Sequence, residues 1–408
     1  MKKLVMIALF CAVLNNTVYA QENNEPKAAV QFSFLPFVGT NGMKSFEYTN
    51  CVSINLLAGV SKNETAFTFG GLGNIIKNNA TGFQFAGLAN YVGNEGKGVL
   101  FSGLTNYVRN DYCGFQFGGL ANFSGDFKGV QFGGLFNRTK SVTGIQFGGL
   151  MNLADGKGCG LQFGGLANVV RGDYRGLQFG GLFNTAKDVK GVQFSGLVSV
   201  AKDVNGAQFS GLVNVAKDVN GAQFSGLVNV AKNVEGAQLA GILNIAENSD
   251  CPIGLVNIIK NGEKGIGVTY DILGNAMVSF RSGGKYTYGI LGVGYNHKVN
   301  GKGMVVEGGI GANIMTGLSW FRIRNELKVS SIGCGSDEMT LNGGYALLPA
   351  FKIGKHFELF GGPSINYLTS SDPENFHLFK GKTLWNKQTG SRSQQLYVGY
   401  QVGVHYIF

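Results

Sequence analysis

Side chains that could catalyse a reaction or bind a metal are few and scattered in this 408-residue chain. It holds only four histidines, His297, His356, His377 and His405, and no two of them stand at the spacing that places metal ligands on one helix face. An isolated histidine in such a context is more often a structural residue. We therefore expect three of the four to lie in or near barrel strands and each to be a barrel-interior or loop residue, and we predict no metal site.

The sequence also lacks a complete motif for phosphate binding or nucleophilic catalysis. Gly381, Lys382 and Thr383 resemble the end of a phosphate-binding loop, but Phe376 stands where the motif requires a glycine. No serine stands in a Gly-x-Ser-x-Gly elbow. These observations predict a protein that is not an enzyme and has no cofactor.

One set of charged residues, near the end of the chain, could form a site. Apolar and charged residues alternate between 319 and 330, which places Arg322 and its charged neighbours on one face of a strand. We expect Arg322 to face Glu307 on the preceding strand. Because buried charges must be paired, the set predicts a structural ion-pair network rather than a transport or catalytic site. Its members are Glu307, Arg322, Arg324, Glu326, Lys328, Lys352 and Glu358.

The strands that must position these charges are expected to form an antiparallel transmembrane β-barrel over residues 265–408. Alternation predicts about eight strands, near 265–272, 276–281, 285–295, 303–315, 319–330, 339–352, 356–369 and 395–408. After the first link, short and long connections alternate, as in barrels with short periplasmic turns and long external loops. The apolar face of such a barrel contacts outer-membrane lipid, and its polar face lines the interior.

Ahead of this region, residues 66–259 repeat one short sequence motif with a period of 15 or 16 residues. The position of Gln208 can be followed through twelve units, from Thr68 to Gln238. A fixed short period indicates stacked repeats, in which each unit covers its neighbour's core. A parallel β-solenoid is favoured because most connectors carry an apolar residue, such as Val204, that suits a core-facing corner. The alternative is one large antiparallel barrel in which every repeat unit forms a transmembrane strand.

Within each repeat, period-two alternation separates Ala207 and Phe209 from Gln208 and Ser210, as in a half-buried strand. We expect the regularly spaced asparagines, such as Asn214, to stack in a turn. The phenylalanines and leucines are predicted to form the repeat core: Phe132, Leu135, Phe147, Leu150, Phe163, Leu166, Phe179, Leu182, Phe194, Leu197, Phe209, Leu212, Phe224 and Leu227.

The first residues are typical of a secretory signal peptide, residues 1–20, with cleavage between Ala20 and Gln21. Its removal takes Lys2 and Lys3 and no acid, so the formal net charge falls from +10 to +8 (10 − 2). The remaining basic residues are interspersed with acidic ones, which argues against a nucleic-acid partner. Residues 21–65 are expected to form a polar tail and cap strands ahead of the repeats.

Two parts of the sequence resemble known families. Tyr400, Val402, Val404, Tyr406 and Phe408 resemble the C-terminal insertion signal of small outer-membrane barrels, which implies the barrel-assembly machinery as a partner. The units of the form Gly-x-Gln-Phe-Gly-Gly-Leu-x-Asn resemble the short surface-repeat family of spirochaetes and the Bacteroides group, which has no assigned activity.

Together these features predict a non-enzymatic protein of the outer membrane of a Gram-negative bacterium. It would present a β-repeat surface, held by the barrel, in a structural or interaction role with an envelope or surface partner of unknown identity. A porin-like channel is the alternative if the repeats join the barrel as one large pore.

Overall fold

The structure is a computed structural model that describes residues 25–299, 303–315, 317–333, 340–371, 378–390 and 392–408. The predicted signal peptide and its cleavage site, Ala20 and Gln21, lie outside these residues. The fold is a parallel β-solenoid of about 14 turns followed by a closed eight-stranded antiparallel barrel. The predicted fold class is therefore confirmed, and the single large barrel is not formed. The chain divides into two compact units, Met1–Asp188 and Val189–Phe408.

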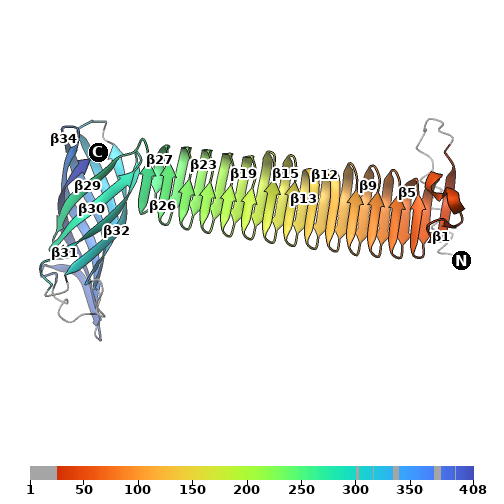
Figure 1. Ribbon diagram of the computed structural model, residues 1–408. Coiled ribbons are helices and arrows are strands. Elements are labelled where there is room, and N and C mark those ends of the chain that lie inside the picture. The colour runs from red at the N-terminus through yellow and green to blue at the C-terminus, as the bar shows by residue number, and fades with distance from the viewer. Residues whose placement is uncertain (1–24, 300–302, 316, 334–339, 372–377, 391) are drawn as a thin grey trace. The chain divides into compact units, whose positions relative to one another are not determined.

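The first unit contains a cap and most of the repeats (Figure 1). Strand β1 pairs in parallel with β3, and β2 folds back antiparallel on β1. In the cap, Asn41 donates to the Gln31 and Asn50 side chains, which covers the polar end of the stack. The cap elements are β1 (Lys27–Leu35), β2 (Val38–Gly39), the 3-10 helix η2 (Gly42–Glu47), β3 (Thr49–Asn55) and β4 (Ala58–Ser61).

Each following coil has a longer and a shorter strand that pair in parallel with their equivalents one repeat away. The longer strands of this unit are β5 (Asn63–Gly70), β7 (Ala80–Ala86), β9 (Gly96–Ser102), β11 (Tyr112–Gly118), β12 (Ala121–Gly133), β13 (Phe136–Gly148), β15 (Gly158–Gly164) and β17 (Tyr174–Gly180). The shorter strands are β6 (Gly73–Ile76), β8 (Ala89–Val92), β10 (Thr105–Val108), β14 (Met151–Ala154), β16 (Ala167–Val170) and β18 (Phe183–Thr185). Strands β12 and β13 each run from the shorter strand of one coil into the longer strand of the next.

The second unit holds the last coils and the barrel. Its longer repeat strands are β19 (Asp188–Ser195), β21 (Asp203–Ser210), β23 (Asp218–Ser225), β25 (Asn233–Ala240) and β27 (Asn248–Ile253). Its shorter ones are β20 (Val198–Val200), β22 (Val213–Val215), β24 (Val228–Val230), β26 (Leu243–Ala246) and β28 (Val256–Ile259). The register is that of identical residues: Asp203 pairs with Asp218 and Ser210 with Ser225.

The interior of the solenoid combines ladders of buried amides with buried apolar residues such as Ile76 and Tyr112, which corrects the predicted core of phenylalanines and leucines. Gln208 and Asn214 are fully buried, and Val204 is buried at the connector corner as expected. Gln223 Nε2 donates to Gln208 Oε1 at 2.9 Å, and Asn214 Nδ2 donates to Asn229 Oδ1 at 2.9 Å. Because most of these amides bond their equivalents in the next coil, most of the buried amide groups are satisfied along the stack. The glutamine ladder is interrupted where Leu100 pairs with Gln116, and Gln116 Nε2 has no hydrogen-bond partner among the described residues.

The phenylalanines and leucines lie on the outside instead. Phe209 and Phe224 stack with their ring centroids 4.8 Å apart on the outer face, and Leu212 is 38 % exposed at the turn. The predicted alternation is present, but the glutamine face is buried and the phenylalanine face is outside. A ladder of amides can fill a narrow interior as completely as apolar groups. None of the residues predicted as the repeat core is buried: Phe132, Leu135, Phe147, Leu150, Phe163, Leu166, Phe179, Leu182, Phe194, Leu197, Phe209, Leu212, Phe224 and Leu227.

A glycine at the position of Gly206 recurs with a φ near +139°, where a side chain would be strained. A Cβ at Gly206 would also lie 2.0 Å from the carbonyl oxygen of Gly191 in the neighbouring coil. The glycine therefore bends the longer strand where two backbones meet, which explains its fixed place in the repeat.

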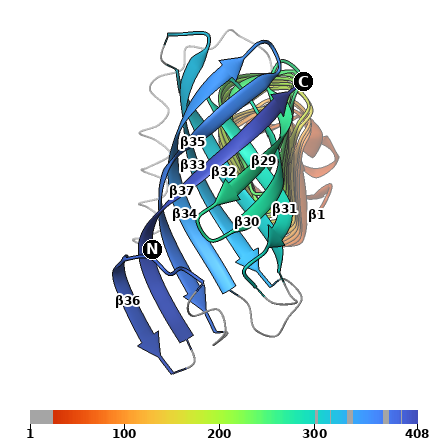
Figure 2. The same cartoon turned by 90° about the vertical axis from the view of Figure 1, so that its left-hand side faces the viewer.

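The barrel closes because β29 pairs with both β30 and β37 (Figure 2). Its strands are β29 (Lys264–Asp271), β30 (Asn275–Gly283), β31 (Thr287–Asn296), β32 (Met304–Met315), β33 (Phe321–Ile332), β34 (Thr340–Ile353), β35 (Phe357–Ser370) and β37 (Arg392–Ile407). A further strand, β36 (Thr383–Thr389), pairs only with the start of β37 and projects beyond the barrel at one end (Figure 2). The turns after β30, β32 and β34 lie at the opposite end, together with the start of β29 and the end of β37. The short turn between β29 and β30 lies at the same end as β36.

Candidate functional site: the barrel interior

The barrel strands separate an apolar outer face from a charged interior. On β37, Val398, Tyr400, Val402, Val404 and Tyr406 are each 43–50 % exposed on the outer face, and Phe408 follows them at 61 %. On β33 the inward residues Arg322, Arg324 and Glu326 are buried. The period-two alternation in the sequence thus places apolar residues on the outer face of the barrel and charged residues on the inner face.

One group of interior charges is centred on Glu326. Arg281 Nε and Nη2 donate to its two carboxylate oxygens at 3.0 and 3.2 Å, which is a bidentate pair. The hydroxyl of Tyr288 donates to Glu326 Oε1 at 3.1 Å. Arg281 was absent from the predicted network, although its parity with Met277 and Ser279 on β30 could have revealed it.

A second group is centred on Glu358. Arg322 Nε and Nη2 donate to it at 2.9 and 2.5 Å, and Arg324 Nη2 donates at 2.8 Å. Glu263, in the connector before β29, accepts from Arg322 at 2.6 Å and from Lys352 at 2.9 Å. Burial acts to raise the pKa of Glu263, but Arg322 and Lys352 lower it to about 2. Glu263 lies in a connector outside any strand pattern, so alternation does not identify it.

Glu307 does not face Arg322, so that expectation is wrong. The register pairs Glu307 with Ser330 and Arg322 with Met315, which places the two residues at different levels of the barrel. Glu307 Oε2 instead accepts from Lys328 Nζ at 2.9 Å. The predicted residues are therefore all brought inside one barrel but divided among separate ion pairs.

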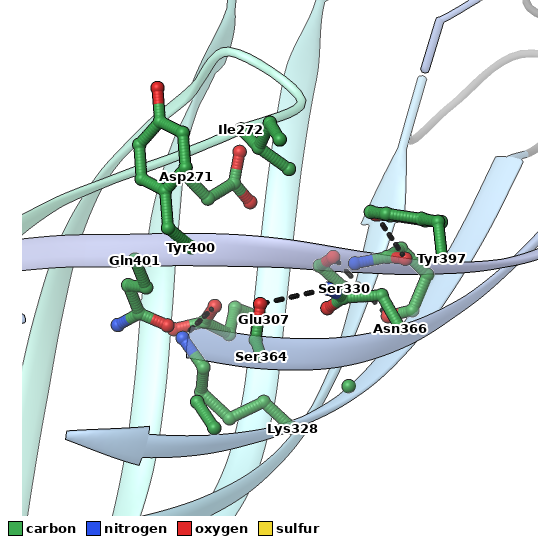
Figure 3. A pocket seen from close by; sticks show the side chains of 13 residues that line it. Asp271, Ile272, Glu307, Lys328, Ser330, Ser364, Asn366, Tyr397, Tyr400 and Gln401 are labelled. Carbon is green, nitrogen blue, oxygen red and sulfur yellow. Dashed lines mark hydrogen bonds and ion pairs between the residues drawn. The ribbon is translucent and has the colours of Figure 1, made fainter. Parts of the chain in front are cut away.

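The pair of Glu307 and Lys328 lines a small polar cavity (Figure 3). Asp271, Gln401 and the Tyr397 side chain also line it. Its volume of ≈ 30 Å³ has room for about two water molecules. A cavity of this size suits hydration of the charges rather than a substrate.

Aromatic rings complete the interior. The guanidinium carbons of Arg281 and Arg324 lie 5.0 and 4.9 Å from the centroid of the Phe360 ring, within cation–π range. Arg324 Nη2 also donates to His405 Nδ1 at 3.0 Å. Among the described residues, Arg324 has only one carboxylate partner, Glu358, and these contacts with the Phe360 and His405 rings hold its guanidinium in place.

The other histidines lie apart from this network. His297 and His356 are exposed, and each approaches a backbone carbonyl, of Gly274 and Ile407 respectively, at 2.9 Å. His377 lies outside the described residues. Lys382, from the partial phosphate-loop motif, is exposed just before β36, with no strand–loop–helix around it.

The interior charges balance. Five acidic residues, Asp271, Glu263, Glu307, Glu326 and Glu358, meet five basic ones, Arg281, Arg322, Arg324, Lys328 and Lys352. Each carboxylate except that of Asp271, which accepts from Asn275, forms an ion pair. Such pairing offsets the cost of burying these charges in the barrel interior. Among the described residues, no group of three or more His, Cys, Asp or Glu could hold a metal ion.

Within the part of the chain that the structure describes, we found no helix of the length and apolarity needed to span a membrane. Comparison of the chain with protein-family models, with curated proteins and with solved structures found no match. The resemblance of the repeats to bacterial surface-repeat proteins stays a prediction.

Proposed function

We propose that this chain is a non-enzymatic outer-membrane protein whose barrel is an anchor and whose solenoid is its working surface. The observation that carries the proposal is the closed eight-stranded barrel, with apolar residues outside and paired charges inside. In water, Val268, Val278 and Val404 would sit side by side at 58, 51 and 46 % exposure. In a bilayer, the same residues form the apolar band that barrels of this size present to lipid.

An anchor fits this barrel better than a channel does. The channel alternative required the repeats to join the barrel, and they form a separate parallel sheet instead. An eight-stranded barrel is only wide enough for its own side chains, and here the ion pairs of Glu326 and Glu358 occupy the centre.

The solenoid suits a structural or interaction role. Stacked coils present the same residues at every repeat, so an extended partner could bind many equivalent sites. An envelope or surface component is the expected partner class, and the barrel-assembly machinery would insert the anchor. Among the described residues, the carboxylates of Glu263, Glu307, Glu326 and Glu358 are held in ion pairs, which supports a non-enzymatic role.

A charge placed on the outer wall tests the anchor. Val268→Arg should strongly reduce the amount of assembled protein in urea-washed outer membranes, because arginine near the bilayer midplane costs a barrel roughly 2–4 kcal/mol. Asn386→Arg, on the exposed strand β36, is the matched control and should leave the yield unchanged. Equal yields from the two variants would overturn the proposal that this wall contacts lipid.

A further inference from the structure

The outer surface of each coil in the second unit is divided into an apolar and a polar part. Around the Gly-Leu turn, the coil presents Phe209, Leu212, Val213 and Val215, none of them buried. The connector side presents charged and amide side chains instead, such as Asn205. The leucine column of this unit, here called the leucine stripe, consists of Leu197, Leu212, Leu227, Ile242 and Leu255.

The first four members of the leucine stripe are 38–50 % exposed: Leu197, Leu212, Leu227 and Ile242. A soluble monomer rarely exposes a contiguous apolar surface of more than a few hundred Å². The equivalent leucines of the first unit are exposed to a similar extent, for example Leu150 at 44 % and Leu166 at 43 %. A row of exposed apolar side chains repeated in this way indicates a surface that another molecule covers in the functional state.

The last residue of the leucine stripe lies against the outer wall of the barrel. A Cβ built on Gly308 would lie 3.6 Å from Leu255 Cδ2, and one built on Gly289 would lie 2.2 Å from the Leu255 carbonyl oxygen. Gly308 stands in the outward row of β32 between Val306 and Ile310, which are 37 and 38 % exposed. Leu255 therefore sits within the apolar wall, because the wall lacks side chains at that point.

Hydrogen bonds fix this coil beside the first short turn of the barrel. Asn257 N donates to Ser282 Oγ at 3.0 Å, and Asn257 Nδ2 donates to the Ser282 carbonyl at 3.1 Å. Thr287 Oγ1 donates to the Pro252 carbonyl at 2.7 Å. The coil is thus joined to both strands of the β30–β31 hairpin, and the level at which Leu255 meets the wall is set by the fold.

We propose that the leucine stripe lies in the membrane interface, with its side chains in contact with lipid acyl chains. This inference rests on the proposed function, because it takes the barrel wall as the lipid-facing surface. If that wall is in lipid, Leu255 is at the depth of the acyl chains. The other residues of the leucine stripe then extend away from the barrel wall, starting at Leu255. Amphipathic segments bury their apolar face by roughly 5–10 Å at such an interface, and this solenoid would do the same with a β-structure.

Lipid is the occupant that the contact with the wall favours. The leucine stripe is continuous with a surface that already needs an apolar environment, whereas nothing places a second copy of the chain there. A second copy packed stripe to stripe would cover the same leucines without lipid, and the experiment below separates the two.

The test uses the full-length protein in phosphatidylethanolamine/phosphatidylglycerol vesicles, with Cys51, Cys113, Cys159, Cys251 and Cys334 replaced by serine. Single cysteines carrying a bimane fluorophore report contact with lipids that bear a nitroxide quencher on the acyl chain. Leu212→Cys lies on the leucine stripe, and Asn205→Cys lies on the polar side of the same coil. Val268→Cys reports the barrel wall and so tests the proposed function separately.

The inference predicts that acyl-chain nitroxides quench bimane at 212 and 268 several-fold more than at 205. Quenching at 268 without quenching at 212 would overturn the inference while leaving the proposed anchor intact. Bimane at 212 that is unquenched by lipid, together with disulfide crosslinking of Leu212→Cys between copies, would assign the stripe to a second copy instead. Absence of quenching at 268 would overturn the anchor, and the inference with it.

Discussion

At the scale of single residues, the solenoid shows why polarity alone does not identify the buried face. Gln208 is more polar than Phe209, yet Gln208 is fully buried. A buried amide is costly when unpaired, but a parallel in-register stack supplies a partner wherever the next coil carries the same amide, as Gln223 does for Gln208. Phe209 keeps its ring faces covered by stacking and exposes its edges. The structure therefore follows hydrogen-bond satisfaction along the stack rather than the hydropathy of the single repeat.

Glu64 is the exception among the buried side chains of the first coil, and it predicts a pH dependence. It is 1 % exposed and accepts from Ser53 Oγ at 2.7 Å and Asn50 Nδ2 at 3.1 Å. Burial raises its pKa, against the opposing effect of these donors. Because the folded state favours the neutral acid, its contribution to stability is fully present below the unfolded pKa near 4.5 and is lost as the pH rises towards the folded value.

We therefore expect Glu64→Gln to raise the denaturant midpoint of the cap at pH 8 and to change it little at pH 4. The amide keeps an acceptor for Ser53 without burying a charge. Hydrogen exchange of the first coils in increasing denaturant, compared at pH 4 and pH 8, measures this midpoint. The same substitution at the exposed Glu235 serves as the control, and identical pH profiles for wild type and Glu64→Gln would contradict the account.

The interior ion pairs predict which charges depend on each other. Arg322 and Glu358 form two hydrogen bonds in the barrel, and each has a second ionic partner, Glu263 for Arg322 and Arg324 for Glu358. Removing one of them therefore weakens the buried network without leaving the other wholly unpaired, so we expect a cost below the roughly 3–5 kcal/mol of an uncompensated buried charge. In a double-mutant cycle, alanine at both positions should cost clearly less than the sum of the single changes. The cycle of Arg322 with Glu307 should be additive. Urea unfolding in vesicles measures both cycles, and the reverse pattern would show that the register of β32 and β33 is wrong.

At the scale of elements, the barrel strands could be predicted closely from the sequence and the solenoid faces could not. The alternation on β33 located its strand and its inward face, because only one face of a barrel strand tolerates Arg322 and Arg324. Both faces of a repeat strand carry residues that can stack, so alternation left the choice of face open. The pairing of Arg322 also depends on register, which no single strand encodes.

The candidate site was incomplete for a related reason. Arg281 sits on a shorter strand with few charged neighbours, and Glu263 lies in a connector, where no periodicity applies. Strand β36 was missed because it pairs along a single edge and projects beyond the barrel.

The last strand makes an element-scale prediction. Tyr406 packs against Phe357 with ring centroids 5.2 Å apart, and Phe408 N donates to the Lys264 carbonyl at 3.0 Å, next to the closing pair of β29 and β37. Deleting Tyr406–Phe408 removes this contact and the end of the apolar row, so assembled, heat-modifiable protein should be lost. Removal of an equally short exposed segment, Asn386–Gln388, is the control. Unchanged membrane yield after the C-terminal deletion would contradict the role of this strand.

At the scale of the whole molecule, an even number of strands puts both ends of the barrel chain at the same end. Glu263, just before β29, pairs with Arg322 near the start of β33 and with Lys352 near the end of β34. Strand β36 lies at the other end of the barrel. If the short turns face the periplasm, the coils joined before β29 do so too. The resemblance to surface repeats points to the opposite side, so the two expectations can be separated by experiment.

Labelling of intact cells with a membrane-impermeant maleimide tests the central claim most directly. In a background without native cysteines, a cysteine at Asn386 should be labelled on unbroken cells. A cysteine at Asn220, exposed on a repeat connector, should be labelled only after the outer membrane is permeabilised. Labelling at position 220 on intact cells would contradict the periplasmic placement of the repeats, and labelling at neither position would contradict the exposure of the β36 end of the barrel at the cell surface.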